Sequence, residues 1–320
     1  MKIIGTGSAL PRYVVSNDML AGFLDTSDEW ITTRTGIKTR RLLTKETLRE
    51  LAIKAGQQAI VSAGLEPEDI DYLICSNVGN SYVTPGLGTI IMGPLGCKCP
   101  SFDLNGACAG FIYSLDIADA FFKTGRVKNI LIVCAEEPSR FCNWHERETS
   151  VLFADGAGAV VLTAGDGYVD GVVSGECHTD ALYYKLEMER TPYDRVEEKT
   201  TPLVMQGREV FRLAVHASIN DVDNLLSKTG IKPEEIDLFL LHQANLRIIE
   251  SIRTHLGQPK EKFPTSLQRY GNTSSASIPI LMDELSREGV LKDGMKIMLS
   301  AFGGGFVSAA AILKWNKIDY

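Results

Sequence analysis

One cysteine stands out because its surroundings could support covalent chemistry. Cys108 lies in a run of small residues, NGACAGF at 105–111, directly before an apolar helix pattern. A cysteine at the start of a helix lies near unpaired N–H groups and the positive end of the helix dipole, which favours the nucleophilic thiolate. The small neighbours leave room for a bulky acyl group. We therefore expect Cys108 to accept an acyl group, although a random cysteine is more often a buried core residue.

Two polar side chains elsewhere could assist such a nucleophile. His242 follows the apolar run 238–241, and Asn272 lies in the turn YGNTSS that starts at Tyr270. Either could be structural, because a lone histidine usually is and asparagine favours turns and helix N-caps. The three glycines at 303–305 could form a plain flexible turn or bring backbone N–H groups close to a ligand.

An internal repeat indicates how these distant residues could meet. The segment GLEPEDIDYLI at 64–74 is answered by GIKPEEIDLFL at 230–240, an offset of 166 residues. Each copy follows a helix-like pattern and leads into a short apolar run typical of a buried strand. The predicted helices are 51–62 and 215–226, and the predicted strands are 72–75 and 238–241.

A second pair of similar segments completes the domain organisation. ADGAGAV at 154–160 resembles AFGGGFV at 301–307 with an offset of 147, so the first half carries extra residues, expected within 136–150. Strands that alternate with helices predict an α/β fold of two βαβ-rich halves whose parallel-biased sheets pack together. The polar, Pro-flanked segment 191–202 is expected to be a surface loop. The two predicted halves are residues 1–167 and 168–320.

Superposing the two halves predicts a common site. With the offset of 166, Cys108 corresponds to Ser274, and His242 corresponds to Ser76 at the end of the equivalent strand. Pseudo-symmetry then brings two helix N-termini and one strand end together at the interface between the halves. Cys108, His242 and Asn272 come from these three points.

Composition excludes several other classes of function. The 320 residues are 44% hydrophobic, carry a formal net charge of -7 and contain no Lys/Arg run, which argues against nucleic-acid binding. No signal peptide and no apolar run of bilayer-spanning length is apparent, so we expect a cytoplasmic protein without membrane association. Seven cysteines fit reduced thiols. Cys97 and Cys99 lack a second ligand pair at zinc-site spacing, so we expect no metal.

Taken together, the motifs resemble the signature of β-ketoacyl-[acyl-carrier-protein] synthase III in the thiolase-like superfamily. The resemblance implies a five-layered α-β-α-β-α fold from a duplicated half, a homodimer that starts fatty-acid chains, and no metal or redox cofactor. Val83 lies about where the family lines the acyl pocket with a residue of the neighbouring subunit. The matching motifs are ACAGF at 107–111, HQANLR at 242–247, GNTSSAS at 271–277 and FGGGF at 302–306, with DTSDEWI at 25–31, DGAG at 155–158 and MQGREVF at 205–211.

The resemblance also implies a role for each site residue. Cys108 would take an acyl group from acetyl-CoA or another short acyl-CoA, with the N–H groups of Cys108 and Gly304 holding the oxyanion. His242 and Asn272 would donate hydrogen bonds to the thioester carbonyl of malonyl-carrier protein during decarboxylation, and the product would be a 3-oxoacyl-carrier protein. The implied CoA contacts are Thr26, Trp30, Arg34, Arg147, Gly207, Phe211, Ala244 and Asn245, and the implied carrier-protein contacts are Gln243, Ala244, Asn245, Leu246 and Arg247.

Three alternatives remain open from the residues. Relatives in secondary metabolism use other starters, or transfer the acyl group to oxygen or nitrogen. A thiol hydrolase could use Cys108, His242 and Asn272 with the histidine as base. A non-catalytic CoA-binding scaffold is disfavoured because all three reactive positions are intact.

Overall fold

The computed structural model describes residues 1–186 and 200–318. Most of the predicted surface loop at 191–202 therefore lies outside the described residues. Its last two residues, Thr201 and Pro202, belong to strand β10 (Thr201–Met205), which pairs antiparallel with β9 (Leu182–Lys185).

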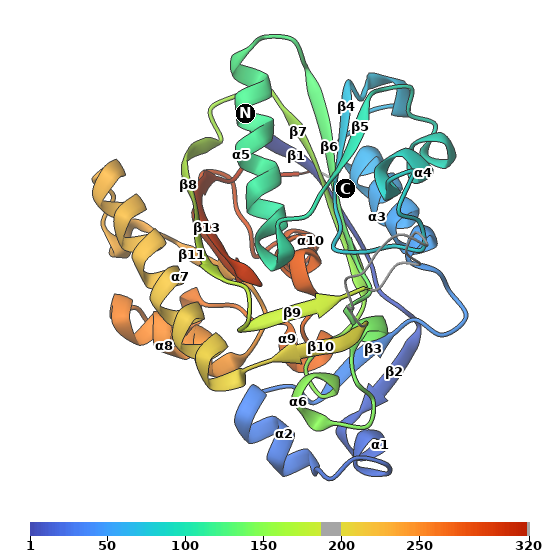
Figure 1. Ribbon diagram of the computed structural model, residues 1–320. Coiled ribbons are helices and arrows are strands. Elements are labelled where there is room, and N and C mark those ends of the chain that lie inside the picture. The colour runs from blue at the N-terminus through green and yellow to red at the C-terminus, as the bar shows by residue number, and fades with distance from the viewer. Residues whose placement is uncertain (187–199, 319–320) are drawn as a thin grey trace.

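Two mixed β-sheets form the framework of the molecule (Figure 1). The first has the strand order β1-β7-β6-β4-β5, and the second has the order β11-β12-β13-β8. The first sheet consists of β1 (Lys2–Ala9), β4 (Tyr72–Ser76), β5 (Ser101–Leu104), β6 (Asn129–Glu136) and β7 (Gly156–Thr163). The second consists of β8 (Tyr168–His178), β11 (Leu238–Leu241), β12 (Lys296–Gly303) and β13 (Gly305–Lys314).

Strand directions confirm the duplication and correct one expectation. The run β1-β7-β6-β4 in the first sheet and the run β8-β13-β12-β11 in the second have the same order and the same directions. The prediction of parallel-biased sheets is wrong, because β7 and β13 each run back antiparallel to the strand before them. Among the strands that the structure describes, the parallel pairs are β4 with β5, β4 with β6, and β11 with β12.

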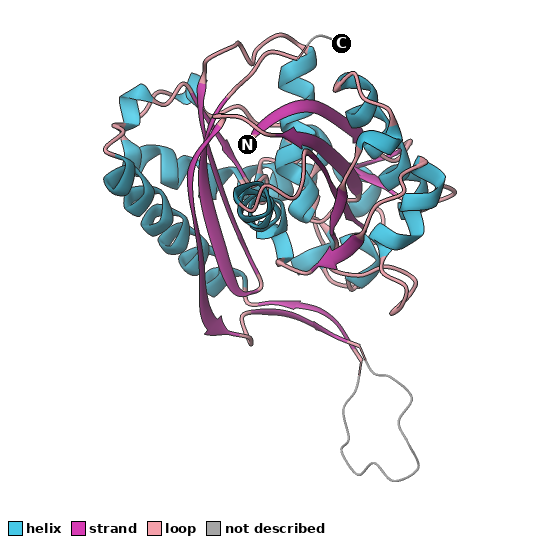
Figure 2. Cartoon of the chain, turned by 90° about the horizontal axis from the view of Figure 1, so that it is seen from above, coloured by secondary structure: helices cyan, strands magenta, loops and turns pink. Residues whose placement is uncertain are grey.

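Helices cover both sheets and fill the space between them, which gives the predicted five layers (Figure 2). Three hydrophobic clusters lie between successive layers, one on the outer face of each sheet and one between the sheets. The outer helices on the first sheet are α3 (Leu48–Ser62) and α4 (Leu87–Leu95), and those on the second are α7 (Gly207–Thr229) and α8 (Leu246–Leu256). The central helices are α5 (Gly110–Lys123) and α10 (Ser277–Arg287).

Helix α3 illustrates how the sequence sets the layer spacing. Thr47 and Glu50 form a capping box that begins the helix. Its buried face includes the small residues Ala52, Ala55, Gly56 and Ala59, which allow close approach to β1. Side chains would not fit at the facing glycines, since a Cβ at Gly5 would lie 2.2 Å from the Ala59 carbonyl oxygen and one at Gly7 would lie 2.3 Å from that of Ala55.

The helix-initiating turns show that the offset drifts by one residue between the halves. The 3-10 turns Ala107–Ala109 and Ser274–Ala276 precede α5 and α10, and both open with a non-glycine residue at positive φ, 45° at Ala107 and 52° at Ser274. Cys108 is therefore equivalent to Ser275, and the predicted equivalence with Ser274 is wrong by one position.

Several short elements lie around one end of the sheets, where the functional site is found. Four of them are β2 (Tyr13–Ser16), α1 (Asn17–Ala21), α2 (Asp28–Thr35) and β3 (Thr39–Leu42). They belong to the first half in sequence, yet their apolar residues pack into the cluster beneath α7 and α8. The extra residues of the first half contain the 3-10 turn Pro138–Phe141 and the short helix α6 (Arg147–Ser150). The remaining elements are α9 (Leu267–Tyr270) and the 3-10 turns Pro67–Asp69, Pro233–Glu235 and Lys260–Lys262.

Candidate active site

Close backbone packing fixes the turn that carries Cys108. A Cβ at Gly110 would lie 2.0 Å from the Ser76 hydroxyl at the end of β4. A Cβ at Gly303 would lie 2.6 Å from the Cys108 backbone nitrogen. These glycines let the turn sit between the ends of β4 and β12, with the Cys108 side chain partly exposed on a pocket.

The Cys108 sulfur is a thiol in this resting structure. Burial is the largest influence on it and raises its pKa to about 12, while the contact with the Ser274 hydroxyl, whose Oγ lies 3.3 Å from Sγ, acts in the opposite direction. The expectation that the helix start would favour a thiolate is wrong here, because desolvation of the charged form outweighs it. The proton of Cys108 must therefore leave when the sulfur attacks.

His242 presents one ring nitrogen to the pocket. Its Nδ1 lies 2.7 Å from Ser277 Oγ, and that oxygen also accepts the Gln243 backbone N–H at 3.2 Å. The Ser277 proton is then free to point at Nδ1, which favours the tautomer with the proton on Nε2. Nε2 is buried and has no hydrogen-bond partner among the described residues. Burial lowers the pKa of His242 to about 3, so the ring is neutral.

Asn272 is oriented by bonds on three sides. Its backbone exchanges hydrogen bonds with the Leu152 oxygen at 2.9 Å and the Ala154 nitrogen at 2.8 Å. Its side-chain oxygen accepts the Ser274 backbone N–H at 2.9 Å. The amide nitrogen is thereby left as the donor available to the pocket.

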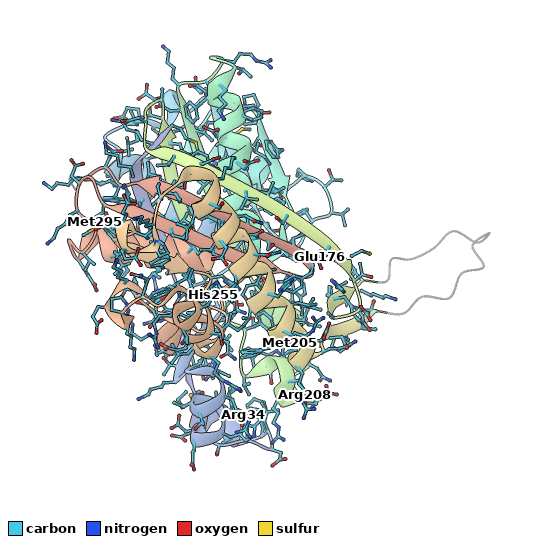
Figure 3. The ribbon with its side chains drawn as sticks, turned by 90° about the vertical axis from the view of Figure 1, so that its left-hand side faces the viewer. Arg34, Glu176, Met205, Arg208, His255 and Met295 are labelled. Carbon is cyan, nitrogen blue, oxygen red and sulfur yellow. The ribbon has the colours of Figure 1, made fainter. Side chains whose placement is uncertain are left out.

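A single pocket of about 730 Å³ joins these three side chains to the protein surface. Phe302 lies beside His242 with the ring centroids 5.3 Å apart, which keeps the inner end apolar. Figure 3 labels three of the lining residues, Arg34, Met205 and Arg208, which lie in the lower half of that view. The lining residues are Trp30, Arg34, Thr35, Cys108, Arg147, Glu148, Val151, Leu152, Phe153, Leu182, Met205, Gly207, Arg208, Val210, Phe211, His242, Ala244, Asn245, Arg247, Ile248, Asn272, Phe302 and Gly303.

Two guanidinium groups lie over one aromatic ring at the pocket mouth. The guanidinium carbons of Arg34 and Arg147 each lie 4.5 Å from the centroid of the Trp30 ring. Asn245 caps α8 and donates from its amide to the Arg34 carbonyl at 3.1 Å, which ties α2 to α8. Such a mouth suits a ligand that has a flat ring and phosphate groups.

Family models and full-length relatives agree with this site. The model described as 3-Oxoacyl-[acyl-carrier-protein (ACP)] synthase III matches residues 102–181, and the one for the C terminal of that synthase matches residues 226–315. The chain is 42% identical over 315 residues to a β-ketoacyl-[acyl-carrier-protein] synthase III of Aquifex aeolicus, covering 98% of this chain and 99% of the relative.

The chain belongs to the β-ketoacyl-[acyl-carrier-protein] synthase III family. It is accordingly an acyltransferase of the condensing type. Identity to the Clostridium acetobutylicum member is 40%, with 99% of both chains covered.

Solved structures confirm the thiolase-like fold. The 3-oxoacyl-[acyl-carrier-protein] synthase III from Aquifex aeolicus superposes with a TM-score of 0.91 at 41% identity, covering 98% of this chain and 99% of that one. The priming β-ketosynthase of the R1128 polyketide pathway gives a TM-score of 0.93 at 33% identity, covering 99% of this chain and 97% of that one.

Most residues suggested by the likeness to synthase III lie together in the pocket, and four do not line it. Thr26 lies just before α2, and Leu246 is half-buried against Gly36. Gln243 is 1% exposed and accepts N–H groups of 266 and 267, so its side chain offers no surface to a carrier protein. A Cβ at Gly304 would lie 2.8 Å from the Leu182 oxygen, and its oxyanion role stays a prediction.

Three polar residues beside the synthase III site had no role assigned to them from the sequence. Ser277 contacts His242, Ser274 contacts Cys108, and the buried carboxyl of Glu136 accepts from the Ser274 hydroxyl at 3.3 Å. An acidic residue directly after the apolar run 130–135 was the only available signal for Glu136.

Two further findings concern the described residues alone. None of their helices is long and apolar enough to cross a bilayer. No group of three or more His, Cys, Asp or Glu side chains within them is placed to hold a metal ion.

Proposed function

We propose that the enzyme joins a short acyl group from acyl-CoA to malonyl-carrier protein with loss of carbon dioxide, giving the 3-oxoacyl-carrier protein that starts a fatty-acid chain. The observation that carries the proposal is the single pocket onto which Cys108, His242 and Asn272 all open.

In the first half-reaction Cys108 attacks the acyl thioester. The sulfur forms a bond to the carbonyl carbon, and CoA leaves as its thiol after taking up a proton. The N–H groups of Cys108 and Gly304 hold the oxyanion. Trp30, Arg34 and Arg147 at the mouth bind the nucleotide end of CoA, and the pocket between the mouth and Cys108 takes the pantetheine arm.

In the second half-reaction malonyl-carrier protein replaces CoA in the same pocket. As its carboxylate leaves as carbon dioxide, negative charge collects on the thioester oxygen. Nε2–H of neutral His242 and the amide of Asn272 donate to that oxygen, and each such donor lowers the barrier by roughly 3 kcal/mol. The resulting carbanion attacks the acyl-Cys108 carbonyl and releases the Cys108 thiolate.

Partners and setting form part of the same proposal. Arg247 and Arg208, both exposed at the mouth, supply positive charge for an acidic carrier protein. No metal or redox cofactor takes part in the proposed reaction.

We expect a cytoplasmic homodimer. Support for the dimer comes from β5, which pairs only with β4 in the described residues, and from Val83, which is 78% exposed. Sedimentation at twice the chain mass is the expected result, and a monomer contradicts it.

The activity is tested by supplying malonyl-carrier protein with a panel of acyl-CoAs and measuring carbon dioxide and 3-oxoacyl-carrier protein. Both should form with a short starter, and 3-oxoacyl-carrier protein should no longer form in Cys108→Ser. Hydrolysis of acyl-CoA without a carbon–carbon bond would instead support a thiol hydrolase.

A second candidate function differs in the starter. The 33% identity to a priming β-ketosynthase of a polyketide pathway favours considering a starter other than acetyl. The same panel decides, because the acyl-CoA with the highest kcat/KM identifies the starter.

A further inference from the structure

A buried carboxylate is hydrogen-bonded to the same hydroxyl as the nucleophile. Glu136 ends β6, is 2% exposed and accepts the Val78 N–H at 3.1 Å through Oε2. Its Oε1 lies 3.3 Å from Ser274 Oγ, and Ser274 Oγ lies 3.3 Å from Cys108 Sγ. One hydroxyl group therefore bridges the thiol and the carboxylate.

The charges around this bridge make simple loss of the thiol proton to water unfavourable. No Lys, Arg or His forms an ion pair with Glu136 in the described part of the chain, and the titratable groups facing it are the thiols of Cys75, Cys108 and Cys134. Loss of the Cys108 proton to water would leave two negative charges in one desolvated site. Transfer of that proton to Glu136 would leave only one.

We propose that Glu136 accepts the Cys108 proton through Ser274 as Cys108 attacks the acyl thioester. This inference rests on the acylation step of the proposed function. The S–H bond breaks, its proton binds Ser274 Oγ, and the Ser274 proton moves to Glu136 Oε1. The sulfur electron pair forms the bond to the acyl carbon while the bond from that carbon to the CoA sulfur breaks. The CoA thiolate takes a proton from water, and Glu136 returns its proton to water.

Two properties suit Glu136 to this task. Burial is the largest cause that raises its pKa, to about 7, which is close to the pH at which such an enzyme works. Its carboxylate is also held in place, because the Ser275 hydroxyl donates to Oε1 at 2.6 Å and the Val78 N–H donates to Oε2.

Ser275 offers a matched control for Ser274. Its hydroxyl bonds to the same carboxylate oxygen and receives the Ser76 hydroxyl at 3.0 Å, but it has no hydrogen bond to Cys108 among the described residues. Replacing either serine by alanine removes one hydroxyl bound to Glu136. Only the change at Ser274 interrupts the path from the thiol.

The test is single-turnover acylation by acetyl-CoA, followed by intact-protein mass at a series of pH values. In the unsubstituted enzyme the rate should rise through neutrality and then level off as Glu136 becomes fully ionised. Glu136→Gln and Ser274→Ala should acylate on the order of 10²-fold more slowly at pH 7, with a rate that keeps rising with pH. Ser275→Ala should keep the plateau and move the inflection to higher pH, since the carboxylate loses one donor.

Decarboxylation of malonyl-carrier protein without acyl-CoA serves as the second readout, because it depends on His242 and Asn272 rather than on the Cys108 proton. It should persist in Glu136→Gln and Ser274→Ala. An unchanged acylation rate and pH profile in Glu136→Gln, or a parallel loss of acylation and decarboxylation, would overturn the relay. If the unsubstituted enzyme never gains an acyl group, the proposed function itself fails.

Discussion

His242 can act as a hydrogen-bond donor while neutral because Ser277 occupies its other ring nitrogen. A protonated imidazole would be a stronger donor but would place an unpaired positive charge in a buried, apolar site. Burial therefore selects the neutral form and lowers the pKa of His242 to about 3.

The first prediction concerns that protonation state. Burial lowers the pKa of His242 to about 3, so decarboxylation of malonyl-carrier protein should show no inflection that depends on His242 near 6.5, the ordinary value for histidine. The pH dependence of kcat for decarboxylation, measured in the absence of acyl-CoA, checks this. A rate that changes with an apparent pKa near 6.5, and loses that dependence in His242→Gln, would contradict the account.

The second prediction concerns Arg147 at the pocket mouth. Arg147→Ala removes one of the two guanidinium groups that lie over the Trp30 ring, so KM for acyl-CoA should rise about 3- to 30-fold with kcat little changed, as expected for a cation–π contact. An acetyl thioester that lacks the nucleotide should be used equally by both enzymes. Arg140→Ala is the matched control, because Arg140 pairs with Glu137 and does not line the pocket. A fall in kcat at constant KM would exclude this role.

At the scale of elements, the layer spacing depends on the contact between α3 and β1. Gly5 and Gly7 allow β1 to lie close to α3, because carbonyl groups of α3 occupy the space that their side chains would need. The third prediction is that Gly7→Ala lowers the free energy of unfolding by about 1–3 kcal/mol through overpacking.

Urea unfolding followed by circular dichroism measures this loss. Gly93→Ala in α4 is the control, since a Cβ there would meet no atom within 4 Å and alanine favours a helix. Equal stability of the two variants would show that the α3 contact can relax at no cost.

The sequence predicted the positions of the helices and strands better than the residue-by-residue equivalence of the two halves. The repeated segments placed β11 at its observed residues and β4 one residue short of its end, and they predicted that Cys108, His242 and Asn272 meet, since apolar runs and small-residue turns are local patterns. It could not show that the offset between the two halves is one residue larger at the helix-initiating turns than at the strands. This extra residue makes Ser275 the structural equivalent of Cys108. The sequence also did not predict the direction of the strands, because hydrophobic periodicity does not show whether two strands pair parallel or antiparallel.

The sequence also did not predict which polar side chains are buried. Gln243 lies in a motif suggestive of a surface contact, yet its side chain holds a loop in the interior. The thiol state of Cys108 and the raised pKa of Glu136 both arise from desolvation by segments far away in the chain. Such effects depend on tertiary packing.

At the scale of the whole molecule, burying the Glu136 carboxyl at the interface between the halves makes the stability of the fold depend on pH. Glu136 has a folded-state pKa of about 7, above its ordinary value of 4.5, so the folded protein binds more protons than the unfolded chain between these values. The stability contributed by this group is present below pH 4.5 and is lost as pH rises through 7.

The fourth prediction follows from that sign. Between pH 4.5 and pH 8, the free energy of unfolding of Glu136→Gln should rise relative to the unsubstituted enzyme by about 3 kcal/mol. The comparison of the two proteins cancels His242 and the other groups that titrate in this range. Urea unfolding at several pH values provides the measurement, and a difference that is constant with pH would contradict a buried, titrating Glu136.

The central claim is that two duplicated halves bring one thiol, one imidazole and one carboxamide to a single pocket for acyl transfer and condensation. Mass spectrometry of the protein after exposure to a short acyl-CoA, with peptide mapping and a subsequent chase by malonyl-carrier protein, tests it most directly. The account predicts an acyl group on Cys108 alone that disappears as 3-oxoacyl-carrier protein forms. An acyl group on another residue, or one on Cys108 that malonyl-carrier protein does not remove, would contradict it.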